Sequence, residues 1–207
     1  MELLDVYDEK GNYIDTLERN YVHQNALWHK TVHCWLYDKF GNIYFQIRAD
    51  RKTYYTTASG HVVAGETIKE AFGREIKEEI GLCVDYDKAT LVDVVTFKMD
   101  KVKKDGSVFK DRVFANVYVL EFDENLNEFD FDLNEVDGLI KVNAKETLDM
   151  FEKGYGEVPA YKIINDNGQI ISIREAAKIG DFLVNEGETL ISKYGDILKK
   201  VIELTEK

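Results

Sequence analysis

The chain has 207 residues, a length that suits one large domain or one domain with an appendage. Hydrophobic residues make up 44% and aromatic residues 12%, enough to bury a core, which excludes a disordered protein. The formal net charge is −12, which argues against general binding to a nucleic-acid polymer or to an anionic membrane. A phosphorylated substrate would therefore need a local group of cations in its site.

Targeting signals are not expected. The first residues, MELLDVYDEKG, carry neither a basic segment nor an apolar run, and no stretch approaches the ~18 apolar residues of a membrane span. The two cysteines, Cys34 and Cys83, sit among apolar residues without paired spacing, which predicts buried thiols in a reducing compartment. We therefore predict a cytoplasmic protein.

Strands dominate the predicted first third of the chain. Residues 3–17 read as two short strands around the turn at 8–12. Residues 30–38 and 43–49 are rich in β-branched and aromatic side chains and flank a Gly-Asn turn, which predicts a hairpin. Residues 54–62 are expected to form a strand or a loop.

A single helix is predicted over residues 67–80. Thr67 is suited to cap its first turn, and Glu70, three residues later, completes the pattern of a capping box. Gly81 is suited to end the helix.

The second half of the chain is predicted to begin with strands at 89–99 and 108–122. A further strand at 137–143 is followed by a short amphipathic helix at 144–154. Residues 162–173 read as a hairpin around NDNG, with a helix as the alternative.

From residue 174 to the end, the pattern predicts two helices with a break near 185–188. This gives a mixed α+β core domain over residues 1–143 and a helix-rich C-terminal extension over 144–207 packed on that core. The helices of the extension are expected either to cover the functional site or to form the contact of a homodimer.

Three glutamates fall within about one turn of the predicted helix, in the segment REIKEEIG at 74–81. At 100° per residue, Glu75 and Glu79 lie on or beside the apolar stripe and Glu78 lies at its edge. An unpaired carboxylate there costs several kcal/mol of desolvation. A hard divalent cation, Mg²⁺ or Mn²⁺, would relieve that cost because it takes oxygen ligands. The alternative is a solvated acidic face paired with lysines.

The longer segment GHVVAGETIKEAFGREIKEEIGL, residues 60–82, resembles the Nudix box, G-x5-E-x7-R-E-U-x-E-E-x-G-U with U aliphatic. The fixed positions are all met, by Gly60, Glu66, Arg74, Glu75, Ile76, Glu78, Glu79, Gly81 and Leu82. The resemblance implies the α/β/α sandwich of that family, with a mixed central sheet and the box as a loop, a helix and a loop. It does not cover the extension.

The resemblance also implies roles for the box residues. Glu75, Glu78 and Glu79 are expected to bind Mg²⁺ or Mn²⁺, with the backbone carbonyl of Gly60 as a further ligand. Arg74 is expected to hold a box glutamate in place, so Glu75, Glu78 and Arg74 are the predicted catalytic residues. An ordinary i,i+4 ion pair between Arg74 and Glu78 is the alternative.

The implied reaction is hydrolysis of a small-molecule diphosphate, such as a nucleoside diphosphate derivative. A carboxylate takes a proton from the attacking water. Glu75 is one candidate for this base, and a loop glutamate is another, with Glu121, Glu124, Glu128 and Glu135 available. The two alternatives to a hydrolase are an isopentenyl-diphosphate isomerase and a non-catalytic ligand-binding module of the same fold.

A closer resemblance to the isopentenyl-diphosphate isomerase branch lies in the segments around His29 and His61, which match histidines of the isomerase metal site. The catalytic cysteine of that branch falls on Ser59 here. Its two glutamates fall on Lys110 and Arg112. Loss of the thiol and of the acidic partner predicts an isomerase-like hydrolase instead of an isomerase.

The four histidines raise the question of a second metal site. His29 and His33 share one face of a predicted strand, and His23 lies near them in the sequence. The two interpretations are a second metal site and histidines that are hydrogen-bonded within the core.

Cations before the box are candidates for substrate phosphate binding. Arg48, Arg51 and Lys52 follow a predicted strand, and the isomerase branch places its diphosphate-binding cations here. The alternative is ordinary solvated surface charge.

Overall fold

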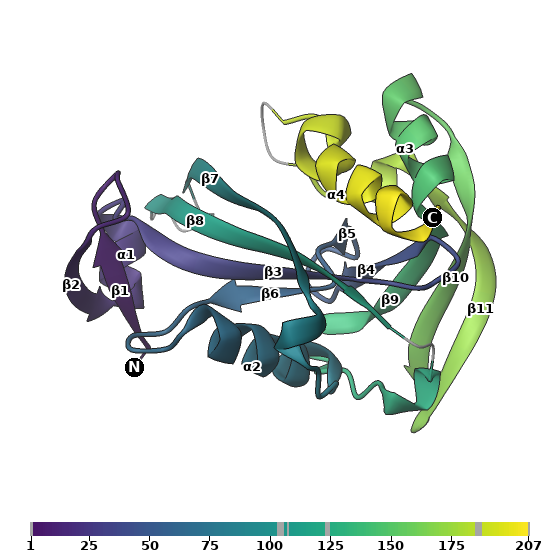
Figure 1. Ribbon diagram of the computed structural model, residues 1–207, viewed down its shortest axis with the longest axis horizontal. Helices are drawn as coiled ribbons and strands as arrows, with labels where there is room; N and C mark the ends of the chain where they lie inside the picture. Colours follow the sequence, from purple (N-terminus) through teal and green to yellow (C-terminus); the bar gives the residue numbers. More distant parts are fainter. Residues whose placement is uncertain (1, 103–105, 107, 123–124, 185–187, 207) are drawn as a thin grey trace.

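A computed structural model describes residues 2–102, 106, 108–122, 125–184 and 188–206. These residues form a mixed sheet in the order β11-β10-β9-β4-β3-β8-β7, with β5 paired to β4 and β6 paired to β3, and a small separate sheet of β1 and β2 (Figure 1). The strands are β1 Leu3–Tyr7, β2 Tyr13–Glu18, β3 His29–Tyr37, β4 Asn42–Arg48, β5 Tyr54–Tyr55, β6 Ala58–His61, β7 Thr90–Val102, β8 Val108–Glu121, β9 Val136–Asn143, β10 Glu157–Asp166 and β11 Gln169–Lys178. The α-helices are α1 Arg19–Gln24, α2 Ile68–Ile80, α3 Ala144–Lys153 and α4 Leu190–Thr205.

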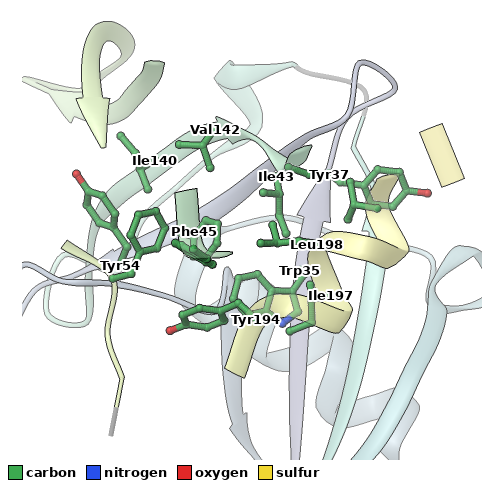
Figure 2. Close-up of a cluster of buried hydrophobic side chains, with 14 of the residues drawn as sticks. Trp35, Tyr37, Ile43, Phe45, Tyr54, Ile140, Val142, Tyr194, Ile197 and Leu198 are labelled. Atoms are coloured by element: carbon green, nitrogen blue, oxygen red, sulfur yellow. The ribbon is translucent and has the colours of Figure 1, made fainter. Parts of the chain in front are cut away.

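Two hydrophobic layers hold the sheet between helices. Successive side chains of a strand point to opposite faces, and β3 follows this rule. Trp35 packs with Phe45 and with Tyr194 of α4 on one face (Figure 2). Cys34 and Leu36 belong to the cluster that contains Phe72, Ile76 and Ile80 of α2 on the other face. The arrangement is the α/β/α sandwich that the box predicted.

The predicted strands of the core are confirmed, but the hairpin predicted between residues 30–38 and 43–49 pairs only next to its turn. Residues of β3 and β4 pair only at Tyr37 and Ile43, next to the predicted turn. Most of β3 instead pairs in parallel with β8, from His29 to Tyr37, and antiparallel with β6. Strand β6, which takes the place of β4 beside most of β3, carries the first residues of the box.

The extension differs from its prediction in one segment. The hairpin predicted around NDNG, residues 165–168, is confirmed as β10 and β11. The helix predicted from residue 174 is wrong, because strand β11 continues to Lys178 and α4 is the helix that follows. Ten register pairs with β10 override the helical propensity of the segment EAAK.

Strand β10 also pairs with β9, so the extension continues the sheet of the predicted core. The division at residue 143 therefore stays a prediction. Within the described ranges, no helix is long and apolar enough to cross a membrane.

Candidate active site

Helix α2 is held at both ends by the residues that the sequence indicated. Thr67 accepts a hydrogen bond from the backbone N–H of Glu70, and the Glu70 side chain accepts one from the backbone of Thr67, which makes the predicted capping box. Gly81 ends the helix with φ of 80° and lies against Asp130, where a Cβ atom would come within 2.6 Å. These two ends set the rotation of the helix and so the direction of its glutamates.

Glu79 points into the protein. The residue is 7% exposed, and its Oε2 accepts hydrogen bonds from the Gln46 side chain at 3.1 Å and from the Ser59 backbone N–H at 3.2 Å. Burial raises the pKa of this carboxyl well above its ordinary value, and the nearby charge of Glu75 raises it further. The prediction that Glu79 faces the core is confirmed, while the supporting role of Gln46 was not visible in the sequence.

Glu75 lies against the backbone of Gly60. A Cβ atom at position 60 would collide with the Glu75 carboxylate, so any other residue there would push this carboxylate out of its position. Burial raises the pKa of Glu75, although Arg74 counteracts part of this effect. Glu78 differs from the other two, because its side chain is 60% exposed. Two carboxylates therefore face inward, and the third lies at the rim.

Arg74 ties the box together through five hydrogen bonds. Its guanidinium donates to Glu66 at 2.8 and 2.9 Å, to Glu75 at 2.7 Å, to Glu78 at 3.0 Å and to the backbone carbonyl of His61 at 2.8 Å. Both sequence interpretations of Arg74 hold, since the i,i+4 pair with Glu78 exists alongside the bonds to Glu66 and Glu75. Arg74 therefore orients two box glutamates and joins them to the loop before the helix.

This donor set fits a hard divalent cation. The oxygens of Glu75, Glu78 and Glu79 come from one helix face, and Gly60 brings a backbone segment directly against Glu75. Mg²⁺ and Mn²⁺ take such oxygen ligands. The raised pKa of the two inner carboxyls is the expected result of gathering negative charge in a buried place.

One loop glutamate lies near these carboxylates. The charge of Glu135 raises the pKa of both Glu75 and Glu79. By contrast, Glu128 accepts a hydrogen bond from Asn125 in its own turn, and Glu121 ends β8. Glu124 lies outside the described residues.

A second cluster of metal-ligand types lies on the other face of the sheet. His23 from α1, His29 from β3 and His61 from β6 bring one ligand atom each within 4.8 Å of one another. Asp111 of β8 joins them, with Oδ1 at 3.3 Å from His29 Nε2 and 3.6 Å from His23 Nε2. His61 Nε2 is 3.3 Å from His23 Nε2.

Backbone carbonyls orient two of these rings. His23 Nδ1 lies 2.8 Å from the carbonyl of Arg19, and His29 Nδ1 lies 3.0 Å from that of Leu27, so each Nδ1–H donates and each Nε2 lone pair faces the cluster. His29 Nε2 and Asp111 Oδ1 are buried and face each other, but neither makes a well-aligned hydrogen bond among the described residues. A tetrahedral cation with bonds of about 2.0–2.1 Å separates its ligand atoms by about 3.3 Å, which matches two of these distances.

The electrostatics of the histidine cluster favour neutral imidazoles at His23 and His61. Burial lowers the pKa of His61 to about 3, helped by the charges of His29 and Arg19, and burial also lowers the pKa of His23. Burial alone would raise the pKa of Asp111, but its close approach to His29, together with His23 and His61, brings it below its ordinary value. Neutral histidines beside a carboxylate are a suitable donor set for Zn²⁺ or Mn²⁺.

The acidic member of this cluster was missed by the sequence alignment. Lys110 and Arg112 had been matched to the acidic positions of the isomerase branch, and the residue between them, Asp111, is the one that faces the histidines. Arg112 instead pairs with Asp100 at 2.6 Å. Strand alternation could have revealed this, because a shift of one residue moves a side chain to the opposite face.

The remaining histidine and the cysteines are placed as follows. His33 stays outside the cluster, with Nδ1 3.5 Å from the Thr56 hydroxyl. Ser59, which stands at the position of the isomerase cysteine, donates a backbone hydrogen bond to Glu79. Cys34 is buried as predicted, but Cys83 is exposed, because it follows the end of α2 on the surface.

A cavity of about 440 Å³ is lined by residues of the box loop and of the histidine cluster. Ser59 and Gly60 contribute the box side of its wall, and His61 and Asp111 contribute the histidine side. Arg48 also lines the cavity. Arg51 and Lys52 lie outside that wall and pair with Asp50 and Asp137, so their predicted phosphate contacts stay predictions.

Comparison with protein-family models assigns residues 27–164 to the NUDIX domain, which is well over half of the chain and includes the whole box. The chain belongs to the Nudix family. It is therefore a Nudix-type hydrolase, as the box predicted.

The Nudix assignment extends to individual relatives. An uncharacterized Nudix hydrolase of Clostridium acetobutylicum is 28% identical over 193 residues, covering 88% of this chain and 90% of that protein. An isopentenyl-diphosphate Delta-isomerase of Cutibacterium acnes is 30% identical over 151 residues, covering 69% of this chain and 74% of that protein. These two matches confirm the resemblance to the isomerase-like branch.

The fold also matches a solved structure. A crystal structure of a Deinococcus radiodurans protein superposes with a TM-score of 0.53 at 22% identity, covering 74% of this Nudix chain and 90% of that one. At this level of identity the match concerns the fold.

Proposed function

We propose that this Nudix chain hydrolyses a phosphoanhydride bond in a nucleoside diphosphate derivative or a similar small diphosphate, with Mg²⁺ or Mn²⁺ as its cofactor. The observation that carries the proposal is the inward-facing pair Glu75 and Glu79, which lie against Gly60 and Ser59 at the wall of a 440 Å³ cavity. Without a cation, two buried carboxylates side by side destabilise the fold, yet hydrogen bonds from Arg74, Gln46 and Ser59 hold them in this position.

The residues that would hold the cation are Glu75, Glu78, Glu79 and the carbonyl of Gly60. When bound, a divalent cation neutralises phosphate charge and lowers the pKa of a bound water. Arg74 keeps Glu75 and Glu78 in position through its hydrogen bonds. The amide of Gln46 and the backbone N–H of Ser59 orient Glu79. These contacts preorganise the carboxylates before substrate arrives.

We infer that Glu135 accepts the proton of the attacking water. Glu75, the alternative, already receives a 2.7 Å hydrogen bond from Arg74, which occupies its Oε1. Glu135 is exposed, and its charge reaches both inner glutamates. Glu135→Gln should lower kcat by about 10²-fold with an unchanged Mg²⁺ activation constant. A larger loss in Glu75→Gln at an unchanged Mg²⁺ constant would make Glu75 the base.

We also propose a second cation at His23, His29, His61 and Asp111. The buried His29 Nε2 and Asp111 Oδ1 support it, because they face each other at 3.3 Å without a well-aligned hydrogen bond, and buried polar atoms are costly unless a ligand satisfies them. His61 and Asp111 of the cluster line the same cavity as Gly60, so a cation there would lie beside the space in which a substrate bound to the box would sit.

The experiment is a hydrolysis screen with purified protein. The panel contains nucleotide sugars, dinucleoside polyphosphates, CoA, NADH and isoprenoid diphosphates, each with Mg²⁺, with Mn²⁺ and with EDTA. Phosphate-releasing turnover that needs the metal is expected for at least one nucleoside diphosphate derivative. Metal-independent binding without turnover would favour the ligand-binding module.

A second measurement separates hydrolysis from isomerisation. Incubation of an isoprenoid diphosphate in D₂O would place deuterium on carbon if the chain were an isomerase. We expect no such exchange, because Ser59 stands where the isomerase branch has its cysteine.

A further inference from the structure

Helix α4 of the C-terminal extension forms one wall of the cavity that meets the box. Ser192, Lys193, Tyr194, Asp196 and Ile197 line it from this helix. The opposite wall is formed by alternate residues of β3 and β8, which face α4. The extension is therefore part of the enclosure around any substrate that reaches Gly60.

Lys193 is the cation that α4 contributes. Its side chain is only 13% exposed, and its ammonium lies 5.0 Å from the ring centre of Tyr55 and 5.5 Å from that of Tyr194. Glu188 pairs with it at 3.5 Å, a longer distance than a charge-assisted hydrogen bond of about 2.7–2.9 Å. The ammonium is thus held in the cavity wall with a loose ionic partner.

A second cation lies over the same aromatic ring. The guanidinium of Arg48 is 5.6 Å from the ring centre of Tyr55, and Asp50 is its carboxylate partner at 2.9 Å. Burial lowers the pKa of Lys193, and the positive charges of Arg48 and Arg51 lower it further. Gathering two cations around one ring is unfavourable by itself, and an anion between them would remove the repulsion.

Unpartnered polar atoms on the facing wall also point to a ligand. Trp35 is 1% exposed and lines the cavity, and its Nε1 has no hydrogen-bond partner among the described residues. Thr31 lies on the same face of β3 and also lines the cavity. Its hydroxyl is likewise buried and unpartnered in the part of the chain that the structure describes. Buried polar atoms of this kind are normally satisfied by a ligand or by water.

We propose that Lys193 is a substrate-binding residue supplied by the extension, which acts with Arg48 to bind a phosphate group of the diphosphate substrate. The inference rests on the proposed hydrolase function and names a residue outside the Nudix box for it. It assigns α4 a direct role in specificity, since a substrate must fit between this helix and the sheet to reach both cations.

The test is the affinity for inorganic pyrophosphate, measured by calorimetry at fixed Mg²⁺ concentration. Lys193→Met keeps an unbranched side chain of similar length against Tyr55 and removes the charge. Its Kd should rise by about tenfold, as expected for loss of a hydrogen bond to a charged group. Glu188→Gln should lower the Kd by about two- to fivefold, because it releases Lys193 from its ion pair.

The matched control is Lys199→Met, which removes the same charge from an exposed position of the same helix. It should leave the Kd within about twofold of the wild-type value, as befits an exposed charge away from the bound anion. Lys193→Arg keeps the charge and should retain most of the affinity. Melting curves identify any variant that fails to fold, and Glu188→Gln then still tests the proposal in a folded protein.

Equal pyrophosphate affinity in wild type, Lys193→Met and Glu188→Gln would overturn the proposal and leave Lys193 with a packing role. Absence of pyrophosphate binding to the wild type would also overturn it. The Lys193 inference and the proposed hydrolase function can be overturned independently. Metal-dependent hydrolysis with no Lys193 effect removes this inference alone, whereas a Lys193 effect without any hydrolysis removes the proposed function alone.

Discussion

The two ligand clusters of this Nudix chain are built in opposite ways. The carboxylates of the box come from one turn of α2, and Arg74, Gln46 and Ser59 satisfy them with hydrogen bonds. The histidine cluster is assembled from α1, β3, β6 and β8, and its buried atoms His29 Nε2 and Asp111 Oδ1 make no well-aligned hydrogen bond among the described residues.

The two clusters therefore differ in how their charge is balanced when no metal ion is bound. The glutamates have a fixed cation, the Arg74 guanidinium, that offsets part of their charge in the metal-free protein. The histidine cluster has mainly lone pairs and one carboxylate facing inward, so a metal ion is the natural partner of its inner atoms. We therefore expect the box to govern turnover and the histidine cluster to govern metal retention.

The largest expected effect is on turnover. Glu79→Gln should lower kcat by about 10²–10³-fold or more, because the cation site loses a charged ligand worth several kcal/mol in the transition state. Circular dichroism should show an intact fold. Glu152→Gln, an exposed glutamate of α3, is the control and should keep full activity. Full activity of Glu79→Gln would remove the metal-site argument for the box.

The next effect is on metal affinity. Asp111→Asn should weaken Zn²⁺ or Mn²⁺ binding by about 10–100-fold, the range seen when a group that supports or ligates a metal is changed. Elemental analysis of the dialysed protein measures it. His33→Gln is the matched control, since His33 lies outside the cluster. Equal metal content in wild type and Asp111→Asn would leave these residues as core histidines.

Arg74→Lys should have an intermediate effect. A lysine cannot reproduce the five hydrogen bonds of the guanidinium, so Glu75 and Glu78 lose their fixed orientation. We expect kcat/KM to fall by about tenfold and the Mg²⁺ activation constant to rise. Steady-state kinetics across Mg²⁺ concentrations measures both. Arg112→Lys, at an ion pair with Asp100 outside the box, should change neither.

The smallest expected effect is on stability without metal. Glu79 has a raised pKa in the folded protein, so its contribution is most favourable below the ordinary carboxyl pKa of 4.5 and is lost as pH rises through the raised value. In EDTA, Glu79→Gln should therefore melt higher than wild type by about 2–4 °C at pH 7, which is about 1 kcal/mol for a chain of this size.

The same difference should shrink as the pH falls and reach zero only well below 4.5, where the Glu79 carboxyl is protonated in both the folded and the unfolded state. Thermal melts in EDTA across this pH range follow it. A wild-type protein that stays more stable than the variant at neutral pH would show that the hydrogen bonds from Gln46 and Ser59 outweigh the desolvation of the charge.

Local patterns predicted the elements that depend on neighbours in the sequence. Helix α2, its caps and the inward direction of Glu75 and Glu79 all follow from positions within one short segment. The segment from residue 174 was predicted wrongly because its helical composition competes with pairing to β10. Asp111 was missed for a related reason, since only the register of β8 beside β3 decides which side chain faces His29.

The sequence by itself determined the family, the carboxylate cluster and the chemistry that it is suited to, because the spacing of a helix converts directly into a common face. The tertiary structure decided the rest. It joined four distant segments into the histidine cluster and laid α4 over the cavity with Lys193 inside. Such contacts depend on strand order and layer packing, which no local periodicity encodes.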